Sequence, residues 1–144
     1  MTNNTVTKIT IAKETGAIFP TAIATSFIEL KNYKYIDFIV SSGVGTAADT
    51  TLTIEGKKGD GTAAALAFKE KSSDGIEFTN ISETGKTLSI GGVAGSCGNA
   101  VLRITADDLA KQGFDRVLLK ATAVTDSTVP GCVVAVLYEP RYTE

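Results

Sequence analysis

Short runs of alternating apolar and polar residues, separated by turn-forming residues, dominate this sequence. In one run, Ile36, Phe38 and Val40 fall on one side of an extended chain and Asp37 falls on the other. Side chains of a strand alternate between its two faces, so this spacing is typical of a strand with one buried face. Few windows hold the i, i+3, i+4 spacing of an amphipathic helix. The chain is therefore predicted to be all-β.

Turn signals divide the chain into strands. Asp74 and Gly75 lie between two runs and form the strongest hairpin signal, and the glycines of residues 57–61 suit a tight hairpin loop. The signals predict about nine or ten short strands, arranged as a β-sandwich or a jelly-roll-like barrel. Since 144 residues is a usual size for one domain, residues 1–144 are expected to form a single domain. Residues 1–12 are expected to be an extended N-terminal arm or an edge strand.

Three segments have more specific interpretations. Residues 62–68 favour a strand, although their alanines also suit a helix. One short helical turn is expected from Asp107 to Gln112, with Asp107 as its N-cap and Gly113 ending it in a left-handed conformation. Residues 132–138 are apolar at consecutive positions, which predicts a strand buried on both faces in the middle of the assembly.

The absence of histidine restricts the chemistry of the chain. It excludes Ser-His-Asp and Cys-His triads, histidine metal sites and imidazole bases. Cys97 and Cys132 are too few for a disulfide framework, and buried reduced thiols are favoured over a bond between them. No other catalytic signature is present, so we expect a protein that is not an enzyme and has no metal or cofactor.

Two features imitate functional motifs. Gly92, Gly95 and Gly98 have the spacing of a phosphate loop, but a strand pattern follows them instead of a helix N-terminus. A surface loop is therefore favoured. Asp107 and Asp108 are adjacent carboxylates without the oxygen-rich pattern of a calcium loop. They are expected to cap and solvate a turn.

The charge balance limits the partners. The net charge of −2, with both signs interspersed, gives no basic field for phosphate groups, so we expect no nucleic acid and no anionic membrane as partners. The chain lacks a secretion signal and the roughly 18 uninterrupted apolar residues of a membrane span, so synthesis in a cytosol is expected. Tyr33, Tyr35, Tyr138 and Tyr142 leave open a sugar-stacking surface, as in a carbohydrate-binding or adhesin-like module, although dispersed tyrosines more often cover a core or an interface.

Four segments carry a further pattern. They are an alternating strand at residues 34–40, GTAAALAF at 61–68, a strand running into ADDL and GFDRV at 103–117, and AVLYEPRY at 135–142. The combination of ADDL-x-x-x-GFD with the EPRY ending is the most distinctive part. With this pattern the chain resembles a family of small proteins encoded beside the major capsid protein of tailed bacteriophages.

The resemblance implies a structural virion protein. Its expected role is that of a capsid decoration protein, which binds the outer surface of the shell formed by the major capsid protein and stabilises it. Such a protein would be made in the host bacterial cytoplasm and located on the capsid surface. A tail or connector component is the alternative within the virion. By analogy with the three-fold sites of viral shells, a homo-oligomer is expected, with a trimer favoured.

The two ends of the chain are the expected contact segments. Thr5, Val6 and Ile9 represent the N-terminal segment, and Arg141 and Tyr142 the C-terminal one. Arginine and tyrosine are enriched at interface hot spots. In the alternative interpretation, Arg141 and Tyr142 close the last strand and cover the core.

Overall fold

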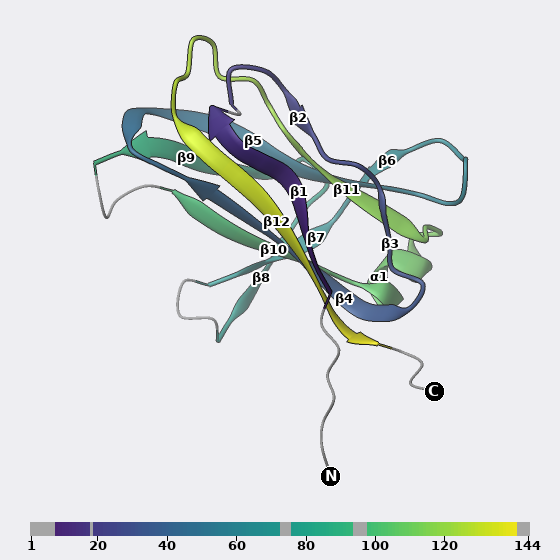
Figure 1. Ribbon diagram of the computed structural model, residues 1–144. Helices are drawn as coiled ribbons and strands as arrows, with labels where there is room; N and C mark the ends of the chain where they lie inside the picture. Colours follow the sequence, from purple (N-terminus) through teal and green to yellow (C-terminus); the bar gives the residue numbers. More distant parts are fainter. Residues whose placement is uncertain (1–7, 18, 73–75, 94–97, 141–144) are drawn as a thin grey trace.

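The computed structural model describes residues 8–17, 19–72, 76–93 and 98–140, which form twelve β-strands and one short helix (Figure 1). The strands make two antiparallel sheets, so the predicted all-β sandwich is confirmed. The strand count exceeds the predicted one because residues 23–29 and 64–71 each divide into two short strands. Residues 62–68 contain strand and no helix, which resolves the alternative left open by their alanines.

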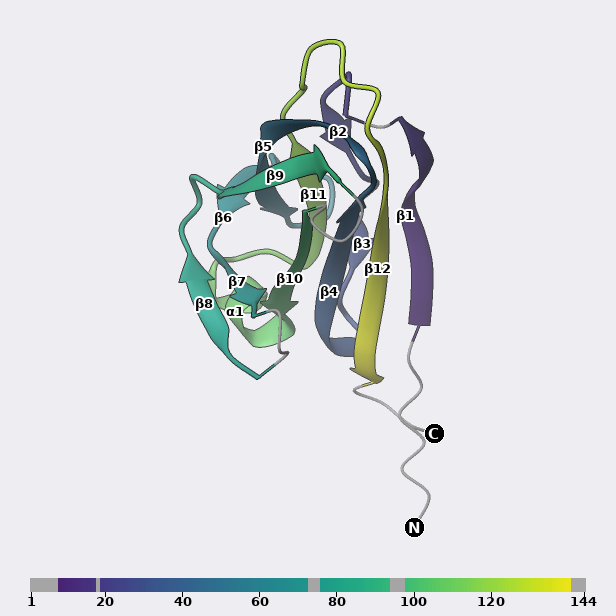
Figure 2. The same ribbon diagram turned by 90° about the vertical axis from the view of Figure 1, so that its left-hand side faces the viewer.

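Six strands form the first sheet, called sheet A here. In spatial order they are β1 (Lys8–Ala17), β12 (Pro130–Pro140), β4 (Tyr33–Ser42), β10 (Asn99–Thr105), β7 (Phe68–Lys71) and β8 (Phe78–Ile81). The sheet curves, so that β1 and β8 lie on opposite sides of the molecule (Figure 2). The antiparallel pairing of β7 with β8 confirms the predicted hairpin, although Asp74 and Gly75 lie outside the described residues.

The second sheet, sheet B, is built around β11 and β5. Its strands are β2 (Ile23–Ala24), β3 (Ile28–Glu29), β11 (Arg116–Ala121), β5 (Gly45–Lys57), β6 (Ala64–Leu66) and β9 (Lys86–Gly92). The long β5 pairs with β11 on one side and with both β6 and β9 on the other. The short strands β2 and β3 both pair with β11 and form the opposite edge.

One hydrophobic core lies between the sheets. Alternate residues of the central strands point into it, as a period of two requires. Burial of these side chains away from water is the main stabilising term of such a fold. The fully buried residues include Phe19, Ile36, Phe38, Val40, Leu52, Ile54, Leu102, Ile104, Leu119, Val133 and Ala135.

The short helix α1 (Ala106–Lys111) lies where the sequence predicts a helical turn, but its N-cap is different. Thr105, the last residue of β10, is extended, and its hydroxyl accepts a hydrogen bond from the backbone N–H of Asp108 at 3.1 Å. The prediction of Asp107 as the cap is therefore wrong, because the cap lies two residues earlier, at Thr105. Gly113 has a φ of +86°, which confirms the predicted left-handed end. Within the described residues, no helix is long and apolar enough to cross a membrane.

The apolar strand near the C-terminus also differs from its prediction. β12 is an inner strand of sheet A, between β1 and β4. Val133, Ala135 and Leu137 are buried in the core; on the other face Val136 is also buried, whereas Val134 and Tyr138 are only half-buried. The expected burial of both faces therefore holds at Val136 but not along the whole strand, because sheet B covers only one of them. The second apolar face of β12 belongs to a surface.

Candidate functional site

The surface side of sheet A is the first candidate for a binding site. We call it the outer face: the residues of β1, β12, β4 and β10 that point away from the core. The antiparallel register aligns them in rows across the strands. The rows run Val134, Ile39, Val101; then Ile9, Val136, Asp37, Arg103; then Tyr138, Tyr35, Thr105.

The first of these rows is apolar. Val134, Ile39 and Val101 are each half-buried by their neighbours in the same sheet. At the edge strand, Ile9 is 67% exposed beside Val136. Single exposed apolar residues are normal on proteins, but a continuous apolar patch usually marks an interaction surface.

Two opposite charges at the centre of the outer face are paired with each other. Arg103 donates from Nε to Asp37 Oδ1 at 2.7 Å and from Nη2 to Asp37 Oδ2 at 2.8 Å. Asp37 is almost completely buried, and such a carboxylate is tolerated only when it is paired and hydrogen-bonded. The bond to Asp37 also raises the pKa of Arg103 above its ordinary value. The pair therefore adds no net charge to the face.

Three aromatic rings surround this ion pair. The guanidinium carbon of Arg103 lies 4.0 Å from the ring centre of Tyr35, 4.6 Å from that of Phe78 and 5.8 Å from that of Tyr138. The rings of Tyr35 and Tyr138 stack, with their centres 4.8 Å apart. These contacts are within the range of cation–π attraction. We call Asp37, Arg103 and the three rings the arginine–aromatic cluster.

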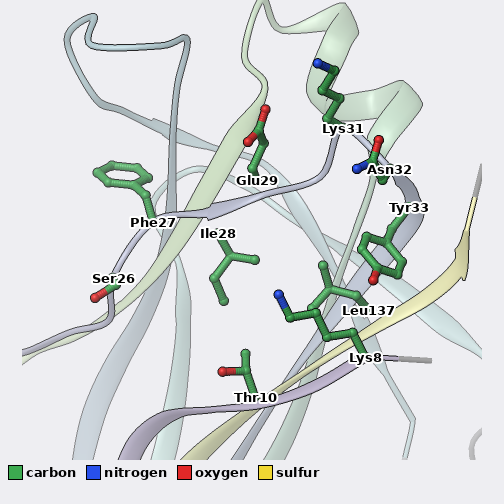
Figure 3. Close-up of a pocket in the computed structure, with 10 residues that line it drawn as sticks. All are labelled: Lys8, Thr10, Ser26, Phe27, Ile28, Glu29, Lys31, Asn32, Tyr33 and Leu137. Atoms are coloured by element: carbon green, nitrogen blue, oxygen red, sulfur yellow. The ribbon is translucent and has the colours of Figure 1, made fainter. Parts of the chain in front are cut away.

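The second candidate is a cleft of about 480 Å³ at the open edge of the sandwich (Figure 3). We call it the edge cleft. It is lined by β1, by residues 26–33 and by Leu137. Figure 3 shows Lys8 and Thr10 pointing from β1 toward Ile28 of β3. Lys8 points inward because it pairs with Leu137, whose side chain lies in the core. An inward-pointing charge on an edge strand disfavours pairing with a further strand.

Of the five residues predicted to make contacts, the described part of the structure includes one. Ile9 lies exposed on β1, at the margin of the outer face. Thr5, Val6, Arg141 and Tyr142 lie outside the described residues. The described ends nevertheless meet: Lys8 pairs with Leu137, so β1 begins where β12 ends. The role of Ile9 as a contact residue stays a prediction.

The residues that imitate a calcium site and a phosphate loop occupy ordinary positions in the fold. Asp107 and Asp108 lie in the first turn of α1, where carboxylates are favourable. Gly92 ends β9, and Gly98 hydrogen-bonds through its carbonyl oxygen to Ser42. In the described ranges, no group of three cysteine or acidic residues is arranged to hold a metal.

Cys132 has a free, half-buried thiol on the strand next to the edge. It pairs in register with Ser41 of β4. The expectation of full burial is therefore wrong for Cys132, because it lies on the uncovered side of sheet A. Cys97 and Gly95 lie outside the described residues.

Sequence reasoning missed the arginine–aromatic cluster. The alternating pattern predicts Asp37 on the surface side of its strand, and Asp37 does point away from the core. Its partner Arg103 is 66 positions away in the sequence, on a strand that had its own alternating pattern. The only available signal was one charged residue in the middle of each of two apolar strands.

Comparison with solved structures identifies a shared fold. The YomS protein derived from the SPBc2 prophage aligns over 96% of this chain and 98% of its own, with 8% identity and a TM-score of 0.58. This chain has the fold of a prophage-derived protein. No protein-family model and no curated protein matches the chain.

Two viral structures align less well. The infectious bursal disease virus Gt strain gives 13% identity and a TM-score of 0.25 over 96% of this chain and 43% of that one. The VP2 subviral particle of the same virus gives 16% identity and a TM-score of 0.27, again over 96% and 43%. TM-scores of this size do not show a shared fold.

Proposed function

We propose that the chain is a structural protein of a tailed-phage virion, and specifically a decoration protein that binds the outer surface of the capsid shell. Two independent findings support this proposal. The segments at 103–117 and 135–142 resemble a phage family encoded beside the major capsid protein. The fold is shared with a prophage-derived protein.

The observation that carries the proposal is that β1 starts and β12 ends at the same end of sheet A. Lys8 pairs with Leu137, only three positions before the end of β12 at Pro140. The two predicted contact segments therefore leave the described fold from one place. The edge cleft, which Lys8 and Leu137 help to line, opens beside it. We call this region the terminal end.

Such an arrangement suits attachment to a repeating shell. One end of the protein would hold the shell, and the rest of the sandwich would project from it. Binding at many equivalent positions reinforces a shell even when each contact is weak, because the contacts act together. The partner in this proposal is the major capsid protein.

Binding to capsids tests the proposal directly. Purified protein is added to expanded capsids that lack it, and the capsids are sedimented and then heated. The protein is expected to co-sediment at a saturable ratio and to raise the temperature at which the capsids open. No co-sedimentation at saturating concentration would overturn the decoration role.

A pair of variants tests the terminal end. Arg141→Ala combined with Tyr142→Ala should weaken capsid binding by about 10-fold or more if these residues are interface hot spots. Lys58→Ala combined with Asp60→Ala is the matched control, because both residues are exposed in the turn between β5 and β6. If the first variant binds normally, or only its folding suffers, the terminal end is not the contact.

A further inference from the structure

We infer that the outer face of sheet A binds a second copy of this chain, face to face. The inference goes beyond the proposed function, because it concerns contacts between copies of the protein and not contacts with the shell. It rests on the charge, composition and size of the outer face.

Charge is the first argument for a second copy. Two identical surfaces bring identical net charges together, so a self-contact favours a patch without unmatched charge. On the outer face Arg103 and Asp37 neutralise each other through two hydrogen bonds. At its border, Lys34 and Glu139 also form an ion pair, at 2.8 Å. The chain as a whole carries a net charge of −2, so a face whose central charges are paired is well suited to meeting its own copy.

Composition is the second argument. The centre of the face is apolar, with Val134, Ile39 and Val101 in one row. The arginine–aromatic cluster lies beside this row, and arginine and tyrosine are the residue types enriched at the centre of interfaces. Arg103 is already held by Asp37 and by the ring of Tyr35, so little side-chain freedom remains to be lost on association.

The size of the face indicates a reversible contact. Over the seven residues of β10 that pair with β4, four strands about 4.8 Å apart, at about 3.4 Å per residue, cover roughly 450 Å². A standard stable interface buries about 800 Å² on each partner. The outer face therefore suits a two-fold dimer that forms and dissociates, in place of the trimer expected by analogy, with the two sheets packed about 10 Å apart.

Sedimentation equilibrium tests the inference with the full chain, from about 1 μM to about 100 μM. The unmodified protein is expected to show a monomer–dimer equilibrium in this range. Val134→Lys and Val101→Lys each place a charge on the outer face and should raise the dimer dissociation constant by about 10-fold or more, since two copies would bring two lysines together. Both residues point away from the core, so the variants should fold, which circular dichroism and thermal unfolding verify.

Val44→Lys is the matched control. Val44 is 58% exposed in the turn after β4, outside the outer face, and this variant should dimerise like the unmodified protein. A protein that stays monomeric at about 100 μM, or a dimer unaffected by either face variant, overturns the inference.

Capsid binding separates this inference from the proposed function. A Val134→Lys protein that is monomeric and still co-sediments with capsids supports both. A monomeric unmodified protein that binds capsids leaves the proposed function standing and overturns only the second-copy contact. If the unmodified protein is monomeric and Val134→Lys abolishes capsid binding, the outer face belongs to the shell contact instead.

Discussion

Arg103 and Asp37 face each other across β10 and β4 and are joined by two hydrogen bonds of 2.7 and 2.8 Å, in a place where the carboxylate has almost no contact with water. The guanidinium is in turn covered by the rings of Tyr35 and Phe78. An ion pair of this kind is costly to break, because removing one partner leaves the other charge poorly solvated.

Replacing Asp37 tests this relationship. Asp37→Ala should lower the free energy of unfolding by about 2–4 kcal/mol, since Arg103 loses both charged acceptors in a largely dry site. Urea unfolding monitored by circular dichroism measures the change. Lys120→Ala serves as the control: its pair with Glu55 is more exposed and should contribute less than about 1 kcal/mol. Equal losses in the two variants would show that burial does not strengthen the Arg103 pair.

The surroundings of Tyr138 predict that the stability of the fold changes at high pH. Burial raises the pKa of Tyr138, and the nearby charge of Asp37 raises it further. Because the folded state holds the phenol proton more tightly, this contribution to stability is complete below the ordinary pKa of 10.0 and is lost as the pH rises through the folded value.

Absorbance at the tyrosinate band should therefore show a late ionisation step, above the ordinary tyrosine pKa of 10.0. In Tyr138→Phe this late step should disappear, and the alkaline loss of stability should become smaller. A late step that persists in Tyr138→Phe would assign it to another tyrosine.

Two paired glycines predict opposite effects of the same substitution. Gly16 and Gly131 are partners across β1 and β12. A Cβ at Gly131 would lie 2.6 Å from the Ser41 carbonyl oxygen and 2.7 Å from the ring of Phe19, whereas a Cβ at Gly16 would meet nothing within 4 Å. Gly131→Ala should therefore destabilise the fold by about 1–3 kcal/mol. Gly16→Ala should be neutral or stabilise it by up to about 1 kcal/mol. Thermal unfolding of the two variants side by side checks the contrast.

The cap of α1 gives a local prediction. Thr105→Ala removes the hydroxyl that accepts from the N–H of Asp108 and should cost about 1 kcal/mol of stability. Thr105→Ser keeps that hydroxyl and should recover most of the loss, as measured by urea unfolding. A Thr105→Ser protein as unstable as Thr105→Ala would point to the lost methyl group and not to the cap.

Local patterns in the sequence predicted where the strands lie. They did not predict equally well which strands lie side by side. The period of two correctly assigned Ile36, Phe38 and Val40 to the core, because a strand's two faces follow from its own residues. The β7–β8 hairpin and the left-handed Gly113 were also predictable, since turn chemistry is local.

Properties that depend on distant segments were not predictable in this way. The apolar run at 132–138 indicated two buried faces, but only the arrangement of the two sheets determines which face is covered. The contact between Asp37 and Arg103 requires the register of β4 against β10, which no local signal specifies. The candidate binding surfaces therefore emerged from topology and not from motifs.

The pairing of Lys8 with Leu137 also makes the chain suited to circular permutation. A linker joining the start of β1 to the end of β12 would span a short distance, and new termini can be opened in the turn between β5 and β6, where Lys58 and Asp60 are exposed. This turn projects away from the start of β1 and the end of β12 (Figure 1). A foreign peptide attached there would be carried away from the terminal end, which makes the fold a scaffold for display.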